Sequence, residues 1–167
     1  MTDEDYMKAA LAQAQEAFAR GDWPVGAVLV DPVRGRVLAH GQNRQVTRSD
    51  ITVHAETDAI RTAQLAHGLP ALQGTTLYCT MEPCPLCAWT LRLAGVQRLV
   101  LGLRHADLGR TDLGRYSIEA FNTLVGFDSL QLTTGVLTAE CLALRRRWGA
   151  DPVAAAVAVA PPSAHAD

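Results

Sequence analysis

Segments with the periodicity of helices alternate along this chain with segments typical of strands. Residues 97–103 (QRLVLGL) form a nearly continuous apolar run, as in a strand that is covered on both faces of its sheet. Residues 3–20 and 54–68 carry apolar side chains at helical spacing, and a glycine marks the end of each segment. This alternation predicts an α/β fold with helices on both faces of one sheet.

The rest of the chain supplies the other elements of that sandwich. Strands are predicted at two places within 23–41 and at 75–80, 97–103 and 129–136. Further helices are predicted at 83–95, 116–126 and 138–148, whereas 42–53 and 104–115 are expected to be loops. The predicted fold is therefore a three-layer α/β/α sandwich around a mixed sheet of about five strands.

The 167 residues correspond to about one domain, which we expect to span residues 1–150. Residues 151–167 are rich in Ala, Val and Pro and are predicted to form a disordered tail. The acidic N-terminus does not resemble a signal peptide, and no apolar run approaches the roughly 20 residues of a membrane span. A cytoplasmic protein without membrane contact is expected. The formal net charge of −2 disfavours a polyanion as the main partner.

Two cysteines, Cys84 and Cys87, stand at the predicted start of the helix at 83–95 in the stretch PCPLC. A Cys-x-x-Cys pair can carry redox chemistry, bind a metal or simply pack in a core, and the pair alone does not decide between these roles. A chain with four cysteines and no secretion signal favours a metal or catalytic role over a disulfide framework. Cys79 and Cys141 are predicted to be core residues.

His54 is the candidate for a third ligand, because it begins the helix that precedes the strand leading to the cysteines. One His and two Cys ligands give zinc a tetrahedral site with one open position, which is typical of catalytic zinc. Glu56 lies two residues after His54, within reach of a water at such a site without being a ligand. A carboxylate there can take a proton from water and deliver it to a leaving amine.

These residues resemble the zinc-dependent cytidine deaminase superfamily, whose pattern is H-x-E followed by P-C-x-x-C. The matching residues are His54-Ala55-Glu56 and Pro83-Cys84-Pro85-Leu86-Cys87, and the similarity extends from about Trp23 to Trp148. The resemblance implies a cytidine deaminase-like fold for residues 1–150 and a Zn²⁺ cofactor bound by His54, Cys84 and Cys87. It also implies Glu56 as the catalytic proton shuttle and a homodimer.

The resemblance also points to substrate-binding residues, in the branch that contains guanine, cytosine and tRNA adenosine deaminases. Asn43 matches an asparagine that bonds the substrate ring, although a turn role is equally expected for it. The Ala55 backbone N–H would bind a ring carbonyl, Val25 would line the pocket, and Asp112 in the loop after residue 103 is a further candidate. Arg145, Arg146 and Arg147 form a basic cluster, but cations are common at the end of a helix.

The expected function is therefore zinc-dependent hydrolytic deamination of a free nucleobase or nucleoside, with release of ammonia. The low net charge ranks a small substrate above the alternative, a tRNA-specific adenosine-to-inosine deaminase. A second alternative, a non-catalytic zinc-binding module, gives no reason for the presence of Glu56.

Overall fold

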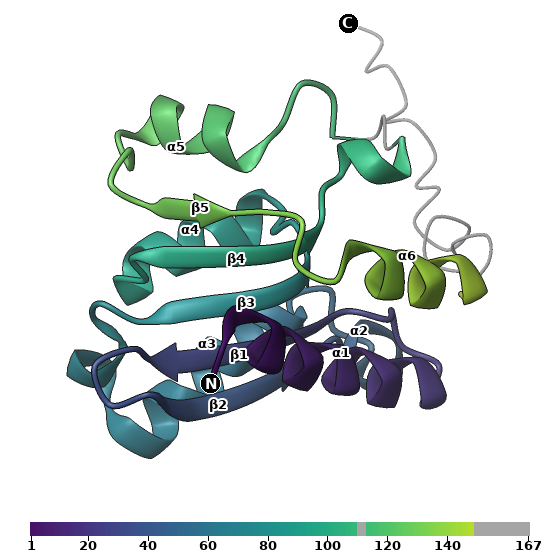
Figure 1. Cartoon of the computed structure of the whole chain (residues 1–167), viewed down its shortest axis with the longest axis horizontal. Coiled ribbons are helices and arrows are strands. Elements are labelled where there is room, and N and C mark those ends of the chain that lie inside the picture. The colour runs from purple at the N-terminus through teal and green to yellow at the C-terminus, as the bar shows by residue number, and fades with distance from the viewer. Residues whose placement is uncertain (110–112, 149–167) are drawn as a thin grey trace, which may run out of the picture.

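A computed structural model describes residues 1–109 and 113–148. Its centre is a five-stranded sheet in the order β2-β1-β3-β4-β5 (Figure 1). The strands are β1 (Gly26–Asp31), β2 (Arg36–Gln42), β3 (Thr76–Met81), β4 (Arg98–Leu103) and β5 (Gln131–Thr133). β1 runs antiparallel to both β2 and β3, whereas β3, β4 and β5 are mutually parallel, so the sheet is mixed as predicted.

Helices cover both faces of the sheet and confirm the three-layer sandwich. α1 (Asp3–Ala19) and α6 (Thr138–Arg147) pack on one face, around a core that contains Met7, Val28 and Val100. α3 (Ala55–His67), α4 (Pro85–Ala94) and α5 (Ile118–Val125) pack on the other face, around a larger core. Both faces of β3 and β4 are thus removed from water, and every residue of these strands except Arg98 is buried.

Two glycines let helices approach the sheet closely from opposite sides. A Cβ atom at Gly26 would collide with the backbone of α1 at Ala10, and one at Gly41 would collide with the backbone of α3 at Ala55. Gly26 pairs with Gln42, the neighbour of Gly41, so the two close approaches lie at the same end of the sheet. Ala55 follows His54 directly, and Gly41 therefore helps to set the position of the predicted metal ligand.

The structure differs from the predicted elements in the segments 42–53 and 129–136, and a 3₁₀ turn lies within the loop predicted at 104–115. The segment 42–53, expected to be a loop, contains the short helix α2 (Gln45–Arg48). The buried carboxylate of Asp22 stabilises its start by accepting hydrogen bonds from the backbone N–H groups of Val46 and Thr47. The strand predicted at 129–136 is only three residues long, because it pairs with β4 only from Arg98 to Val100.

Two single-turn 3₁₀ helices, Leu69–Leu72 and Ala106–Leu108, complete the described elements. No helix in the described ranges combines the length and the apolar composition that crossing a membrane requires. The predicted tail, residues 151–167, lies outside the described residues, so the domain boundary at residue 150 stays a prediction.

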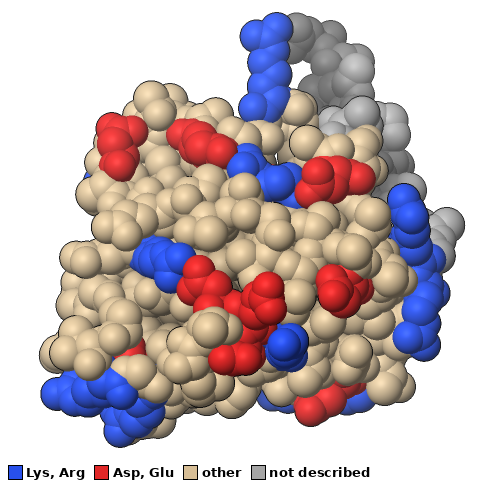
Figure 2. Space-filling view, in the orientation of Figure 1, with Lys and Arg blue, Asp and Glu red and all other residues tan. Residues whose placement is uncertain are grey.

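Charge is unevenly distributed over the face formed by α1 and α6 (Figure 2). Acidic side chains gather over α1, whose first turn holds Asp3, Glu4 and Asp5. Basic side chains line the edge where α6 lies, and the last turn of this helix carries the three consecutive arginines, Arg145–Arg147. The low net charge therefore hides a local basic region.

Candidate metal centre

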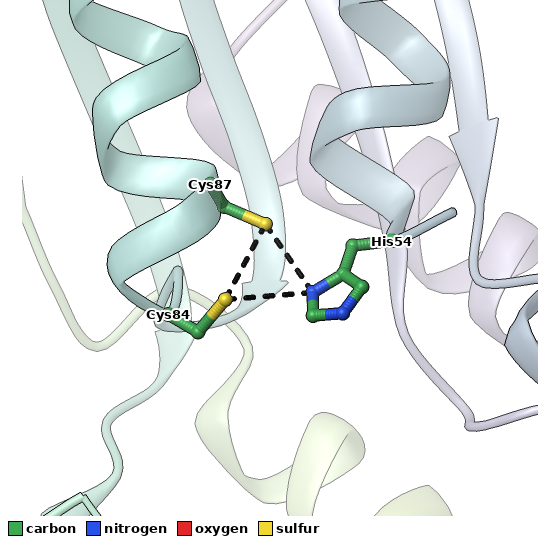
Figure 3. Close-up of side chains that lie close together, drawn as sticks. All are labelled: His54, Cys84 and Cys87. Carbon is green, nitrogen blue, oxygen red and sulfur yellow. Dashed lines mark hydrogen bonds between the residues drawn. The ribbon is translucent and has the colours of Figure 1, made fainter. Parts of the chain in front are cut away.

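His54 lies at the N-cap of α3, with its backbone held in an extended conformation. Its N–H donates a hydrogen bond to Oγ1 of Thr57 (3.0 Å), and the Thr57 hydroxyl is 2.7 Å from the carbonyl oxygen of Thr52. This pair of bonds joins the first turn of α3 to the chain that enters it. The imidazole is thereby directed away from α3, toward the start of α4 (Figure 3).

Cys84 is the N-cap of α4, and Cys87 follows in the first turn of the same helix. Pro85 occupies the first helical position, where its missing N–H leaves no intrahelical bond unmade. One turn of helix brings the two sulfur atoms to the same side, 3.8 Å apart. The N-termini of α3 and α4 thus meet at one point, and their positive dipole ends favour thiolates there.

The three side chains point toward one another in the arrangement of a metal site (Figure 3). Nδ1 of His54 lies 3.5 Å from Sγ of Cys84 and 3.3 Å from Sγ of Cys87. Zinc bond lengths at the tetrahedral angle place two sulfurs about 3.8 Å apart, and a sulfur and a nitrogen about 3.5 Å apart. The observed separations therefore fit zinc. In the described ranges, these residues are the one group of three or more His, Cys, Asp or Glu with ligand atoms this close together.

Proton affinities in the centre also suit a cation. The hydrogen bond shared with Cys87 lowers the pKa of Cys84 to about 4, and the bond to His54 acts in the same direction. That shared bond and burial raise the pKa of Cys87 well above its ordinary value. Burial lowers the pKa of His54, but the hydrogen bond to Cys84 and the charge of Glu56 outweigh it, so the net shift is upward.

Glu56 lies in the first turn of α3 and is only 3% exposed. Burial raises the pKa of its carboxyl above the ordinary value; the charge of Cys84 adds to this effect and that of His54 opposes it. A carboxyl with a raised pKa both accepts and releases a proton more readily near neutral pH. The structure therefore brings together the four residues that the sequence predicted for the centre.

The structure describes three of the four predicted substrate-binding residues. Asn43 is buried, and its N–H donates to the carbonyl oxygen of Val25 (3.1 Å), so the two residues are neighbours. The Asn43 side chain makes the predicted turn, accepting from the N–H of Gln45 and donating to that residue's side chain. Ala55 is fully buried at the first position of α3, and Val25 packs partly buried against the larger core. Asp112 lies outside the described residues.

Sequence reasoning gave no role to Glu82, although this acid directly precedes Pro83 and Cys84. Its carboxylate is buried and accepts four hydrogen bonds. The sequence also gave no indication of Tyr116, whose hydroxyl donates to the carbonyl oxygen of Pro83 (2.5 Å). The position of Glu82 directly before the Pro-Cys pair was the one signal in the sequence that could have singled it out. Nothing in the sequence around Tyr116 distinguishes it from an ordinary loop tyrosine.

The sequence profile described as "Cytidine and deoxycytidylate deaminase zinc-binding region" matches residues 1–103, more than half of the chain. The chain belongs to this deaminase family. The family assignment, together with the separations of His54, Cys84 and Cys87, confirms the predicted zinc cofactor. It also supports the coarser functional prediction, a zinc-dependent hydrolytic deaminase.

Three similar proteins match this chain over most of their length. The tRNA-specific adenosine deaminase of Bacillus subtilis is 37% identical over 141 residues, or 83% of each chain. A chain solved in a study of A-to-I editing by tRNA:A34 deaminases has a TM-score of 0.72 at 32% identity, covering 84% of this chain and 98% of that one. A guanine deaminase from Nitrosomonas europaea has a TM-score of 0.75 at 25% identity, covering 87% and 83%.

These similarities contradict the predicted substrate. The expectation of a free nucleobase or nucleoside rested on a net charge of −2, whereas relatives at 37–40% identity are tRNA-specific adenosine deaminases. Net charge was a poor guide because it averages the acidic start of α1 with the basic end of α6. The alternative weighed from the sequence, a tRNA deaminase, is the better supported.

Proposed function

We propose that this protein is a tRNA adenosine deaminase, which converts an adenosine of a folded tRNA to inosine and releases ammonia. The observation that carries the proposal is the 37% identity to the tRNA-specific adenosine deaminase of Bacillus subtilis over 83% of both chains. The similarity to a chain from work on tRNA:A34 deaminases supports the wobble position of the anticodon as the target. A cytoplasmic location, where tRNA is abundant, stays a prediction.

In this proposal, His54, Cys84 and Cys87 hold the zinc ion through Nδ1 and the two Sγ atoms. Bound zinc supplies Lewis acidity, which makes hydroxide available from water near neutral pH. The first turns of α3 and α4 add their positive ends to the same point. The chain contributes rigidity, because each ligand is fixed at the start of a helix that packs on the sheet.

Glu56 moves the protons in the proposed reaction. Its carboxylate accepts a proton from the attacking water and delivers it to the departing amino nitrogen of adenine. Water attack and loss of ammonia need a single group that first accepts and then donates, and the raised pKa of Glu56 suits both steps. The non-catalytic alternative gives this buried carboxylate no purpose beside the centre.

Three further residues are proposed to hold the purine. Asn43 uses two of its hydrogen-bonding positions on Gln45 and keeps one N–H and one lone pair of its amide for a ring. The N–H of Ala55 belongs to the first turn of α3, where backbone donors have no partner within the helix. Val25, the neighbour of Asn43, offers an apolar contact for the base. Asp112 stays a sequence-based candidate.

The basic end of α6 is a suitable place for tRNA phosphates. The guanidinium of Arg145 lies over the ring of Trp23 (4.9 Å), and that of Arg147 over the ring of Phe18 (5.0 Å). These contacts place the end of α6 next to the segment that enters β1 at Val25, at the same end of the sheet as the metal centre (Figure 1). Phosphate contacts supply much of the affinity for nucleic acids.

A homodimer is also proposed. α4 exposes Leu86, Trp89 and Leu93, which are 44%, 45% and 66% accessible and lie at helical spacing. An exposed apolar stripe of this kind is typical of an interaction surface. Light scattering should give twice the mass of one chain, and a mass of one chain would reject the dimer.

The substrate proposal is tested by ammonia release from the zinc-loaded protein. The panel contains an anticodon stem-loop with adenosine at the wobble position, the same stem-loop with guanosine there, free adenosine, guanine and cytosine. Turnover of the adenosine stem-loop alone is expected. Turnover of guanine or cytosine with the stem-loop untouched would reject the proposal, and no turnover of any compound would favour the non-catalytic module.

A further inference from the structure

Glu82 connects the end of β3 to the turn that carries the cysteines. Its backbone N–H donates to the carbonyl oxygen of Leu103 (2.8 Å), which extends the pairing of β3 with β4 by one bond. Pro83 and Cys84 follow directly. The side chain is only 2% exposed, so its charge must be compensated inside the protein.

Each carboxylate oxygen of Glu82 accepts two hydrogen bonds. Oε1 accepts from the backbone N–H of Ile118 (2.8 Å) and from Nη2 of Arg104 (3.2 Å). Oε2 accepts from the backbone N–H of His105 (2.9 Å) and from Nε of Arg104 (3.0 Å). The donors come from two separate segments, one directly after β4 and one at the start of α5. A single side chain thus ties both segments to the turn before Cys84.

Tyr116 adds a second connection between the same parts. Its hydroxyl donates to the carbonyl oxygen of Pro83, the residue between Glu82 and Cys84. Its ring lies 5.8 Å from the ring of His105 and 6.2 Å from the ring of Phe121. The turn before Cys84 is therefore held by hydrogen bonds at both Glu82 and Pro83, from residues that lie outside β3 and α4.

We propose that Glu82 is a positioning residue for the metal centre: it fixes the Cys84–Cys87 turn and thereby sets the affinity for zinc. The proposal rests on the proposed roles of Cys84 and Cys87 as zinc ligands. Glu82 is not one of the proposed ligands, and both of its carboxylate oxygens are occupied by hydrogen bonds. It acts by holding the backbone from which the two thiolates project, much as outer partners of metal ligands do in other proteins.

The hydrogen bonds make Glu82→Gln an informative substitution. Both oxygens face N–H donors only, so either orientation of the amide sets its NH₂ group against two donors. The substitution keeps the shape and volume of the side chain, but glutamine cannot accept all four of the hydrogen bonds that Glu82 accepts. Glu119→Gln is the matched control, because Glu119 pairs with the same Arg104 (2.6 Å) but is 53% exposed and does not contact the turn.

The experiment measures zinc affinity by competition with a chromophoric chelator, alongside the visible spectrum of the cobalt-substituted protein, which reports tetrahedral geometry. Glu82→Gln should weaken zinc binding about 10- to 100-fold and alter the cobalt spectrum, with Glu119→Gln unchanged. Circular dichroism verifies that each variant is folded. A folded Glu82→Gln with wild-type zinc affinity and spectrum would overturn the proposal.

A second variant covers the case in which Glu82→Gln does not fold. Arg104→Gln leaves Glu82 its two backbone donors and removes the other two, so a smaller loss of zinc affinity is expected; wild-type affinity would then overturn the proposal. These readouts need no substrate. If the wild-type protein deaminated no stem-loop while the variants lost zinc as expected, the proposed function would fail and the role of Glu82 would stand.

Discussion

Nδ1 of His54 lies 3.3 Å from Sγ of Cys87, although the two residues are 33 positions apart in the chain. The contact exists because β1 and β3 pair antiparallel, and because α3 and α4 then begin at the same end of the sheet. The centre is therefore a product of sheet topology and of two helix starts.

Removal of the proposed proton shuttle should separate metal binding from turnover. Glu56→Ala is expected to keep its fold and one zinc per chain while the deamination rate falls at least about 100-fold, since proton transfer by a placed group typically contributes 10²–10⁴. Ammonia release and metal analysis on the same sample measure both effects. Glu140→Ala, at an exposed position of α6, is the control. Wild-type turnover in Glu56→Ala would refute the role.

The two ligand cysteines should differ in function from the two core cysteines. Cys84→Ser and Cys87→Ser are expected to lose zinc, because a serine hydroxyl is a far poorer zinc ligand than a thiolate. Cys141→Ala, which changes a buried cysteine packed against Gly102, should keep one zinc per chain. Metal content after dialysis decides the matter, and zinc retained equally by all three variants would exclude this site.

Gly41→Ala should disturb the centre through α3. The new Cβ meets the backbone of Ala55 and Ala59, which cannot move without shifting His54. We expect a loss of about 3 kcal/mol in the free energy of unfolding and weaker zinc binding. Gly126→Ala controls for conformational strain, because its Cβ would meet open space at a φ of 65° and should cost only about 1–2 kcal/mol. Equal costs for both variants in urea unfolding would contradict the packing argument.

The basic end of α6 should affect binding of tRNA and not of small substrates. Arg146→Ala removes an exposed cation without disturbing the ring contacts of Arg145 and Arg147. The stem-loop should bind more weakly, with the slope of log affinity against log salt reduced by about 1. Arg34→Ala, in the β1–β2 turn at the opposite end of the sheet, is the control. Identical slopes for wild type and Arg146→Ala would place the phosphates elsewhere.

An ion pair at the far end of the sheet should give a defined dependence of stability on pH. Two hydrogen bonds from Arg98 lower the pKa of Asp3, and a further bond from Tyr78 contributes. A lowered folded-state pKa stabilises the protein above the unfolded-state value near 4, and this stability is lost as the pH falls through the folded-state pKa.

Asp3→Asn should therefore cost about 1 kcal/mol at pH 7, a typical value for a partly exposed pair. The difference from wild type should shrink below about pH 4. Urea unfolding of both proteins at pH 7, 4 and 3 measures this difference in the free energy of unfolding. The other titrating groups are the same in both proteins, so their contributions cancel in the comparison. A difference that does not vary with pH would contradict the assignment.

The sandwich and the metal centre could be predicted from the sequence because both depend on patterns of residues that are close together in the chain. The apolar run at residues 97–103 indicates a strand covered on both faces, and helix geometry alone sets the spacing of the side chains in the H-x-E and PCxxC stretches. Glu82 and Tyr116 could not be assigned in this way, since their partners Arg104, Ile118 and Pro83 depend on how distant segments meet. The short helix α2 was missed for the same reason, because the cap at its start is Asp22, more than 20 residues earlier.

The substrate prediction failed at a different level. A net charge is a sum over the whole surface, whereas binding depends on the charge next to the site. Arg145, Arg146 and Arg147 were visible in the sequence, but their position near Trp23 and the entry to β1 follows only from the packing of α6 against α1.

The central claim, adenosine deamination in tRNA, is tested most directly by digesting a full-length tRNA to nucleosides after incubation with the protein and quantifying inosine by mass spectrometry. The wild-type protein should form about one inosine per tRNA that carries wobble adenosine, and none when guanosine replaces it; Glu56→Ala should form none. Absence of inosine with the zinc-loaded wild type, in a preparation that releases ammonia from guanine or free adenosine, would contradict the account.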